Sequence, residues 1–158
     1  MARVTLDDNS KSSPHGINPE AMTIEQRLSS GFILLDKPPG PTSHQIASWV
    51  RDLLGLDRLG HGGTLDPFAT GVLPLMAGKS MKLTKGILKT NKSYIAVLKF
   101  SEAPSTHELE TVMTNLTGRI YNVPPEISAV KVQVRTRRIF KFELIEHNQR
   151  EAIARISC

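Results

Sequence analysis

The sequence predicts a mixed α/β domain. Three observations indicate this class: apolar runs of strand length alternate with amphipathic helical stretches, two capping patterns mark helix starts, and loops rich in glycine and proline separate these segments. In chain order we expect strand, helix, loop, helix, strand, helix, strand and strand. Residues 1–28 are polar and broken by glycine and proline, so we interpret them as an N-terminal arm with one helical turn near Thr23–Leu28. Residues 29–158 would form the domain.

The first strand, loop and helix follow directly after the arm. The apolar run Phe32–Leu35 is typical of a buried strand, and Lys37–Ser43 (KPPGPTS) must be a stiff loop because prolines cannot donate ladder hydrogen bonds. Thr42 and Gln45 can form a capping box that opens a helix, which Gly55 would end. Its predicted apolar stripe consists of Ile46, Trp49, Val50, Leu53 and Leu54.

The middle of the chain is rich in glycine and lysine. Gly60–Gly71 (GHGGTLDPFATG) is predicted to be a loop, because it holds four glycines and a proline in twelve residues. Val72–Ala77 fits either a buried strand or a short turn. Lys79–Lys92 is predicted to be a helix with a lysine face formed by Lys82, Lys85, Lys89 and Lys92.

The second half is predicted to hold three strands and a helix. Tyr94–Phe100 alternates as a strand, and a capping box of Ser105 with Glu108 opens a helix that Gly118 closes. The predicted stripe of this helix consists of Leu109, Val112, Met113 and Leu116. The remaining strands are placed at Ile139–Ile145 and Ala152–Ser157. Because the last one reaches Cys158 without a cap or tail, we expect the domain to be incomplete at this end.

The charge of the chain suggests a polyanionic partner. The net charge is +5, with 20 basic and 15 acidic residues. The arm holds 3 basic and 4 acidic residues, so the remainder carries 17 basic and 11 acidic residues, or +6. This fits nucleic acid, although a solvated basic surface has the same composition. The single cysteine, Cys158, excludes an internal disulfide and a multi-cysteine zinc site. No apolar run approaches the roughly 18 residues of a membrane helix, so we expect a cytoplasmic protein.

Asp66 is the first candidate for chemistry. Neighbouring glycines let a ligand or backbone come close, and Pro67 restricts the conformation of Asp66. A carboxylate on such a loop can act as a nucleophile or general base. On spacing alone, an Asp-Pro turn in which the side chain bonds its own backbone is the more common alternative. His61 could contact a base or be an ordinary loop histidine, and Lys37 could contact a phosphate or be an exposed surface lysine.

Two further features would suit RNA. Tyr94 follows a lysine-rich segment and could stack on a base, although a core tyrosine would look the same. Lys131–Lys141 holds five basic residues and no acid, which fits either a phosphate-binding strip or a strand edge protected by charge. No histidine pair has metal-ligand spacing, and KPPGPTS lacks the Walker A pattern. We therefore predict no metal and no cofactor.

Four motifs together resemble a known family. In order they are GFILLDKPPGPTSHQ, GHGGTLDPFATGVLP, KSYIAVLKF and VPPEISAVKVQVRTRR. They are similar to the pseudouridine synthases that include bacterial tRNA pseudouridine-55 synthase and the dyskerin-like enzymes, over about residues 30–158. The short connection after Phe100 is more similar to the archaeal type. The resemblance implies a synthase fold with a mixed, largely antiparallel sheet flanked by helices.

The resemblance also implies roles for individual residues. Asp66 matches the nucleophilic aspartate, Tyr94 the tyrosine that stacks on the target base, and His61 the histidine near the flipped nucleotide. Lys37 and Lys131 match basic residues that support the site and the RNA. The neighbouring loop residues Gly62, Gly63 and Thr64 would complete the RNA contact. The pocket wall would be formed by Pro124, Pro125, Ser128 and Ala129.

The implied reaction converts uridine to pseudouridine in tRNA, or in rRNA under guidance, without cofactor or metal. Guide-dependent members work with H/ACA guide RNA and small partner proteins. In the family, an arginine in a TYIR-like segment pairs with the catalytic aspartate and a PUA domain follows; neither is within these 158 residues, so we expect weak or no activity from this chain alone. The alternatives are a non-catalytic RNA-binding scaffold of the same fold and, with only a lone carboxylate behind it, an aspartate-dependent hydrolase.

Overall fold

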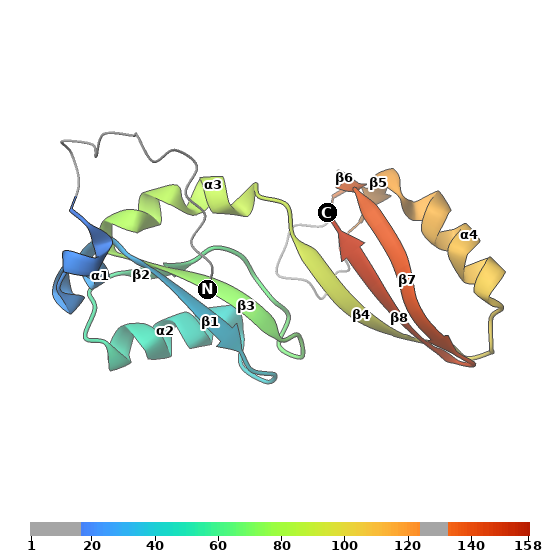
Figure 1. Ribbon diagram of the computed structural model, residues 1–158, viewed down its shortest axis with the longest axis horizontal. Helices are drawn as coiled ribbons and strands as arrows, with labels where there is room; N and C mark the ends of the chain where they lie inside the picture. The colour runs from blue at the N-terminus through green and yellow to red at the C-terminus, as the bar shows by residue number, and fades with distance from the viewer. Residues whose placement is uncertain (1–16, 124–132) are drawn as a thin grey trace. The chain divides into compact units, whose positions relative to one another are not determined.

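A computed structural model describes residues 17–123 and 133–158, which form two compact units, residues 1–89 and 90–158 (Figure 1). All three sheets in the described residues are antiparallel. Together with the helices they make a mixed α+β protein, and the predicted class and largely antiparallel pairing are confirmed.

Unit 1 is a three-stranded sheet with helices packed on it. Its strands β1 (Phe32–Lys37), β3 (Gly71–Ala77) and β2 (Leu59–His61) lie in the order β1-β3-β2. The helical elements are η1 (Pro19–Ala21), α1 (Ile24–Ser30), α2 (Ser43–Leu53), η2 (Gly78–Leu83) and α3 (Thr84–Leu88). The core lies between α2 and the sheet and consists of Ile46, Ala47, Leu73 and Leu75, with Ile33, Leu35, Val50 and Leu59 packed around it.

Unit 2 combines a second three-stranded sheet with a helix and a two-stranded ribbon. Strands β4 (Ser93–Lys99), β8 (Glu151–Ser157) and β7 (Lys141–Asn148) lie in the order β4-β8-β7. Helix α4 (Thr106–Leu116) packs against β7, and β5 (Gly118–Asn122) pairs with β6 (Arg135–Ile139). The buried apolar residues are Leu109 and Met113 on α4 and Ala152 and Ala154 on β8.

The local helix signals in the sequence are confirmed. The side chains of Thr42 and Ser105 each accept a hydrogen bond from the backbone N–H three residues later. The side chains of Gln45 and Glu108 in turn accept a hydrogen bond from the backbone N–H of the cap residue. The expected turn in the arm is also present, since Thr23 caps α1 in the same way. Satisfying these otherwise unpaired N–H groups fixes where each helix begins.

Several finer expectations are wrong. Strand β1 is not buried on both faces, because Leu34 is 72% exposed while its neighbours face α2. On α2 the buried face runs through Ser43, Ile46 and Ala47, whereas Trp49 and Leu53 face solvent. The predicted helix at 79–92 is instead the 3-10 helix η2 followed by the short helix α3. Strands β5 and β6 were not predicted as such, and Val72–Ala77 is the strand rather than the turn.

The longest helices among the described residues, α2 and α4, have 11 residues each. No helix in this part of the chain is long and apolar enough to cross a membrane.

Candidate active site

The loop that carries Asp66 connects β2 to β3 in unit 1. Its first residues are fixed against the sheet, because the Gly62 N–H donates to the Pro74 carbonyl at 2.8 Å. Gly62 is buried, and a Cβ at this position would lie 2.6 Å from Cγ2 of Ile87 on α3. Only glycine fits without displacement, so the loop lies closer to α3 than any other residue would allow.

Lys37 holds the middle of this loop from inside the protein. The residue is fully buried, and its Nζ donates to the carbonyls of Pro38, Pro67 and Ala69 at 3.0, 3.1 and 2.9 Å. A lysine ammonium has three donors, and here each meets a carbonyl oxygen. Burying an ammonium without such partners would cost several kcal/mol, so the loop and the lysine depend on each other.

The position of Lys37 corrects one sequence interpretation. The alternative of an exposed surface lysine is wrong, because the side chain is enclosed at the end of β1. All three donors point to backbone carbonyls, two of them on the loop just after Asp66, which leaves none for a phosphate. Lys37 therefore supports the site through the loop rather than through contact with a ligand.

Ser43, the first residue of α2, holds the loop on the other side of Asp66. Its hydroxyl donates to the Leu65 carbonyl at 3.2 Å and accepts from the Leu65 N–H at 2.9 Å, and the residue is buried. The Gly40 N–H adds a bond to the Pro67 carbonyl at 2.8 Å. The backbone is thus fixed immediately before and after Asp66. Sequence reasoning missed Ser43, because its only local signal is a place next to the Thr42 cap.

Asp66 itself projects from this fixed backbone and is exposed. Its carbonyl accepts from the Ala69 N–H at 3.0 Å, which closes a turn, but within residues 17–123 and 133–158 its carboxylate has no hydrogen bond or ion pair. In the described residues the turn at Asp66 is therefore closed by the backbone and not by the side chain, as the alternative Asp-Pro turn would require. The carboxylate is available to an incoming ligand.

Two histidine rings lie beside the start of the loop. His61, the last residue of β2, has its Nδ1 2.5 Å from the Gly63 carbonyl, and since a carbonyl can only accept, Nδ1 is the donor. This bond orients the ring of His61, which is half-buried, and leaves its Nε2 for another partner. His44 on α2 meets the His61 ring edge-to-face, with centroids 6.5 Å apart. Thr64 follows and is exposed.

Tyr94 lies in unit 2, near the start of β4. It pairs in register with Ile156 on β8, which in turn pairs with Phe142 on β7, so the three side chains share one face of the sheet. The ring is 39% exposed, which excludes a fully buried core tyrosine. Partial burial, and secondarily the charge at Cys158, raise the pKa of Tyr94 above its ordinary value of 10.0.

The basic strip is only partly described. Lys131 and the residues Pro124, Pro125, Ser128 and Ala129 lie outside the described residues. From Arg135 onward the strip is strand β6, in which Arg138 stands directly opposite Arg119 of β5 and lies 5.6 Å from the centroid of the Phe140 ring. Like charges directly opposite each other destabilise a ribbon, which favours an anionic partner over a simple charged edge.

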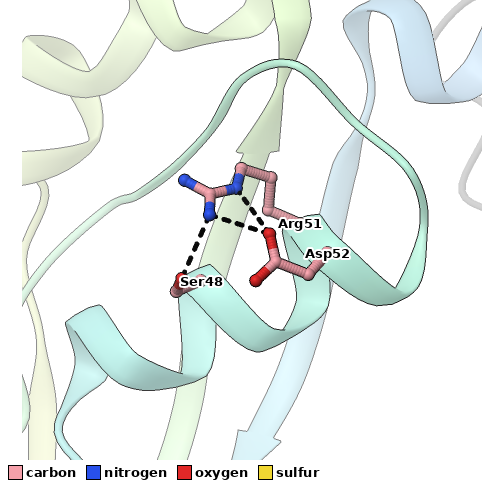
Figure 2. A network of polar contacts seen from close by, with 3 residues as sticks. All are labelled: Ser48, Arg51 and Asp52. Carbon is pink, nitrogen blue, oxygen red and sulfur yellow. Dashed lines mark hydrogen bonds and ion pairs between the residues drawn. The ribbon is translucent and has the colours of Figure 1, made fainter.

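Other surface charges are already engaged. Figure 2 shows Arg51 on α2 donating to the Asp52 carboxylate at 2.9 and 2.7 Å and to the Ser48 hydroxyl at 3.2 Å. This exposed pair is worth little to stability, but it neutralises Arg51 locally. As for metals, the described residues contain no group of three or more His, Cys, Asp or Glu side chains that could hold an ion.

Comparison with known proteins identifies the family of the chain. Residues 51–158 match the TruB family pseudouridylate synthase (N terminal domain), and residues 5–47 match the DKCLD (NUC011) domain. The probable tRNA pseudouridine synthase B of Pyrobaculum calidifontis is 43% identical over 141 residues, which is 89% of this chain and 42% of that protein. Its counterpart in Methanothermobacter thermautotrophicus is 36% identical over 155 residues, covering 98% and 48%.

Solved structures agree with the sequence comparisons. A chain in the crystal structure of a Cbf5-Nop10-Gar1 complex superposes with a TM-score of 0.83 at 38% identity, covering 96% of this chain and 46% of that one. A chain in the structure of an H/ACA RNP bound to a substrate RNA containing 2′-deoxyuridine gives 0.81 at 34% identity, covering 96% and 45%. The chain spans about half the length of the relatives it matches.

Proposed function

Since the chain belongs to the TruB family of pseudouridylate synthases, we propose that it contributes the catalytic carboxylate, Asp66, to the isomerisation of uridine in RNA. The observation that carries the proposal is the state of Asp66. Its carboxylate is exposed and has no partner among the described residues, while the backbone around it is held by the buried side chains of Lys37 and Ser43. A carboxylate that has no hydrogen-bond partner and stands on a fixed backbone is suited to attack a bound substrate.

The reaction needs little beyond such a group. The N1–C1′ glycosidic bond breaks, the uracil turns, and C5 bonds to C1′; the proton lost from C5 is balanced by one gained at N1. Electrons balance without an oxidant or reductant. The Asp66 carboxylate can bond to C1′ or remove a proton from the sugar.

The substrate base must leave its stack to reach Asp66, and the extrusion costs a few kcal/mol. We assign Tyr94 to stack on the extruded base, because its ring is part-exposed near the start of β4. His61 offers Nε2, and we assign Gly63 and the exposed Thr64 to contact the nucleotide, whereas Gly62, buried against Ile87, shapes the loop. Lys37 acts indirectly by holding the loop, and Lys131 belongs to the basic segment that we expect to bind phosphates.

The relatives suggest the setting of the reaction. One similar chain was solved in a Cbf5-Nop10-Gar1 complex and another in an H/ACA RNP bound to substrate RNA. We therefore propose that the protein works with an H/ACA guide RNA and small partner proteins. The names of the Pyrobaculum and Methanothermobacter relatives suggest an alternative setting, in which tRNA is modified without a guide.

A non-catalytic RNA-binding scaffold is the second candidate. The facing arginines of the β5–β6 ribbon favour it, because they would bind RNA whether or not Asp66 reacts. The free carboxylate of Asp66 favours the enzyme.

The Asp66→Asn variant separates these candidates. It should be measured in the longest natural protein that contains these 158 residues, with a tRNA transcript and with a guide-directed substrate. The amide keeps the size of the side chain, so RNA affinity should stay within about threefold, while pseudouridine formation should fall by roughly 10³-fold or more. Pseudouridine formed by the variant at the rate of the unchanged protein would refute the role of Asp66. If the unchanged protein binds both RNAs but forms no pseudouridine, the scaffold is correct.

A further inference from the structure

The segment that follows β3 has two opposite faces of different chemistry. It consists of η2 (Gly78–Leu83) and α3 (Thr84–Leu88), capped by Lys89. Its buried and half-buried residues pack on unit 1, and its exposed residues include four lysines at regular intervals besides Leu83, Gly86 and Leu88. We call the four lysines, Lys79, Lys82, Lys85 and Lys89, the lysine ridge.

The packed face is well fixed to the sheet. The Ser80 hydroxyl donates to the carbonyls of Gly31 and Ala77, both at 2.9 Å, and the Thr84 hydroxyl donates to the Met81 carbonyl at 2.6 Å. Ser80 is buried, and Met81 and Thr84 are half-buried. The segment is therefore a rigid support and not a mobile surface helix.

The packed face also contacts the strand and loop that lead to Asp66. A Cβ at Gly60 would lie 3.2 Å from Cε of Met81, and one at Gly62 would lie 2.6 Å from Cγ2 of Ile87. Gly60 belongs to β2, and Gly62 opens the loop of Asp66. Anything bound to the ridge would thus be held at a fixed place relative to the start of that loop.

The spacing of the lysines follows the local helix. Lys79 and Lys82 are three residues apart in the 3-10 helix η2, Lys85 follows three residues later in α3, and Lys89 follows four residues after that at the C-cap. Residues three apart in a 3-10 helix, and three or four apart in an α-helix, lie on the same side. Each step therefore advances roughly 4.5–6 Å along one side of the segment, from rises of about 2.0 and 1.5 Å per residue.

The positive charge of the ridge is not balanced by acidic residues within the same segment. All four lysines are exposed, the segment from residue 78 to 89 contains no acid, and in the described part of the chain no ion pair involves them. Like charges at these spacings repel each other, which destabilises a helix in the absence of counter-charge. A row of four cations on a rigid support is therefore suited to a polyanion with regularly spaced charge.

We propose that the lysine ridge is a binding site for the phosphate backbone of RNA, separate from the Asp66 carboxylate and fixed to its loop through Ile87. This inference rests on the proposed function, because it takes RNA as the partner. A backbone contact positions RNA without reading its sequence. The ridge would hold a flanking strand while the target nucleotide enters the loop.

The test is the salt dependence of RNA binding by the whole 158-residue chain. A fluorescently labelled RNA stem-loop is titrated at several KCl concentrations against the unchanged chain, the triple variant Lys82→Gln, Lys85→Gln, Lys89→Gln, and a charge-retaining variant with arginine at the same positions. The control variant Lys99→Gln, Arg150→Gln, Arg155→Gln removes three exposed charges from unit 2 that lie outside the basic strip 131–141, one of which has an acidic partner. Thermal unfolding of each variant confirms that it is folded.

The ridge predicts that the glutamine variant loses about 2–3 units of slope in log Kd against log[KCl], since each phosphate contact contributes about 0.7–0.9. The arginine variant should keep the slope, and the unit 2 control should change it by less than about one unit. An unchanged slope in the glutamine variant, or an equal loss in the control, overturns the ridge while leaving the role of Asp66 intact. If polyglutamate competes as well as RNA, the ridge binds an acidic protein instead. If the unchanged chain fails to bind RNA even at low salt, the ridge is wrong, while the proposed function is still decided by the Asp66→Asn measurement in the longest natural protein.

Discussion

The two units hold their candidate residues in different ways. In unit 1 the backbone around Asp66 is fixed by buried polar side chains, Lys37 and Ser43, and β3 next to it buries Leu73 and Leu75. In unit 2, Tyr94 lies at the end of a sheet whose other face is open, with Ile95 and Val97 60% and 63% exposed. A carboxylate that must meet one atom needs a fixed backbone, whereas a ring that stacks on a base tolerates small displacements.

The largest expected effect of a substitution on stability is in unit 1. Lys37→Met leaves the carbonyls of Pro38, Pro67 and Ala69 without their donor, so the free energy of unfolding of unit 1 should fall by about 3–5 kcal/mol. Urea unfolding followed by the fluorescence of Trp49, the single tryptophan of the chain, reports unit 1. Lys79→Met is the control, because Lys79 is an exposed lysine of the same unit and its loss should cost less than about 0.5 kcal/mol. Equal effects of the two variants would contradict the account of Lys37.

A smaller loss is expected at Ser43. Ser43→Ala removes both hydrogen bonds to Leu65 and should lower the free energy of unfolding by about 1–3 kcal/mol in the same experiment. Ser48→Ala on the same helix is the matched control, since its hydroxyl accepts a hydrogen bond from the surface side chain of Arg51 (Figure 2) and its loss should cost less than about 0.5 kcal/mol. If both serines proved equally dispensable, the loop would not depend on α2.

The open face of unit 2 should be far more tolerant. Val97→Thr keeps the shape of an exposed strand residue, so the free energy of unfolding of unit 2 should change by less than about 0.5 kcal/mol. Tyrosine absorbance follows this unit, because both tyrosines of the chain, Tyr94 and Tyr121, belong to it. A loss above about 2 kcal/mol would show that this face is covered in solution, and the contrast between the units would fail.

The smallest effect is a pH dependence at Tyr94. Partial burial raises its pKa in the folded state, so above pH 10 the folded chain keeps a proton that the unfolded chain has lost. Its contribution to stability is complete below that pH and is lost as the pH rises through the folded pKa. In unfolding experiments across this range, Tyr94→Phe should weaken the alkaline decline, and Tyr121→Phe, with an 83% exposed side chain, should not. The same decline in both variants would exclude Tyr94 as its source.

The sequence predicted what local chemistry decides. The capping boxes at Thr42 and Ser105 depend on residues three apart, so the helix starts were predicted correctly. The pairing of β5 with β6 was missed, because it joins segments separated in the chain and depends on no local pattern. The apolar stripe of α2 was misplaced for a similar reason: the sheet, and not the helix, decides that Ala47 is buried while Trp49 is exposed.

The candidate site divides in the same way. Asp66 was found from the resemblance, since its spacing alone favoured an ordinary Asp-Pro turn. The burial of Lys37 could not be predicted, because two of its three partners are carbonyls 30 and 32 residues away. Ser43 was missed because its partner, Leu65, is 22 residues away. Long-range contacts to backbone atoms have no side-chain signature in the sequence.

The central claim is that the position of the Asp66 carboxylate, and not merely its charge, makes the site. Asp66→Glu keeps the acid but extends it by one methylene, and a displacement of about 1 Å can cost roughly 10²-fold in rate. In the longest natural protein that contains this chain, we predict that this variant binds RNA normally and forms pseudouridine at least about a hundredfold more slowly. Formation at the rate of the unchanged protein would contradict the account, because the carboxylate would then need no fixed loop.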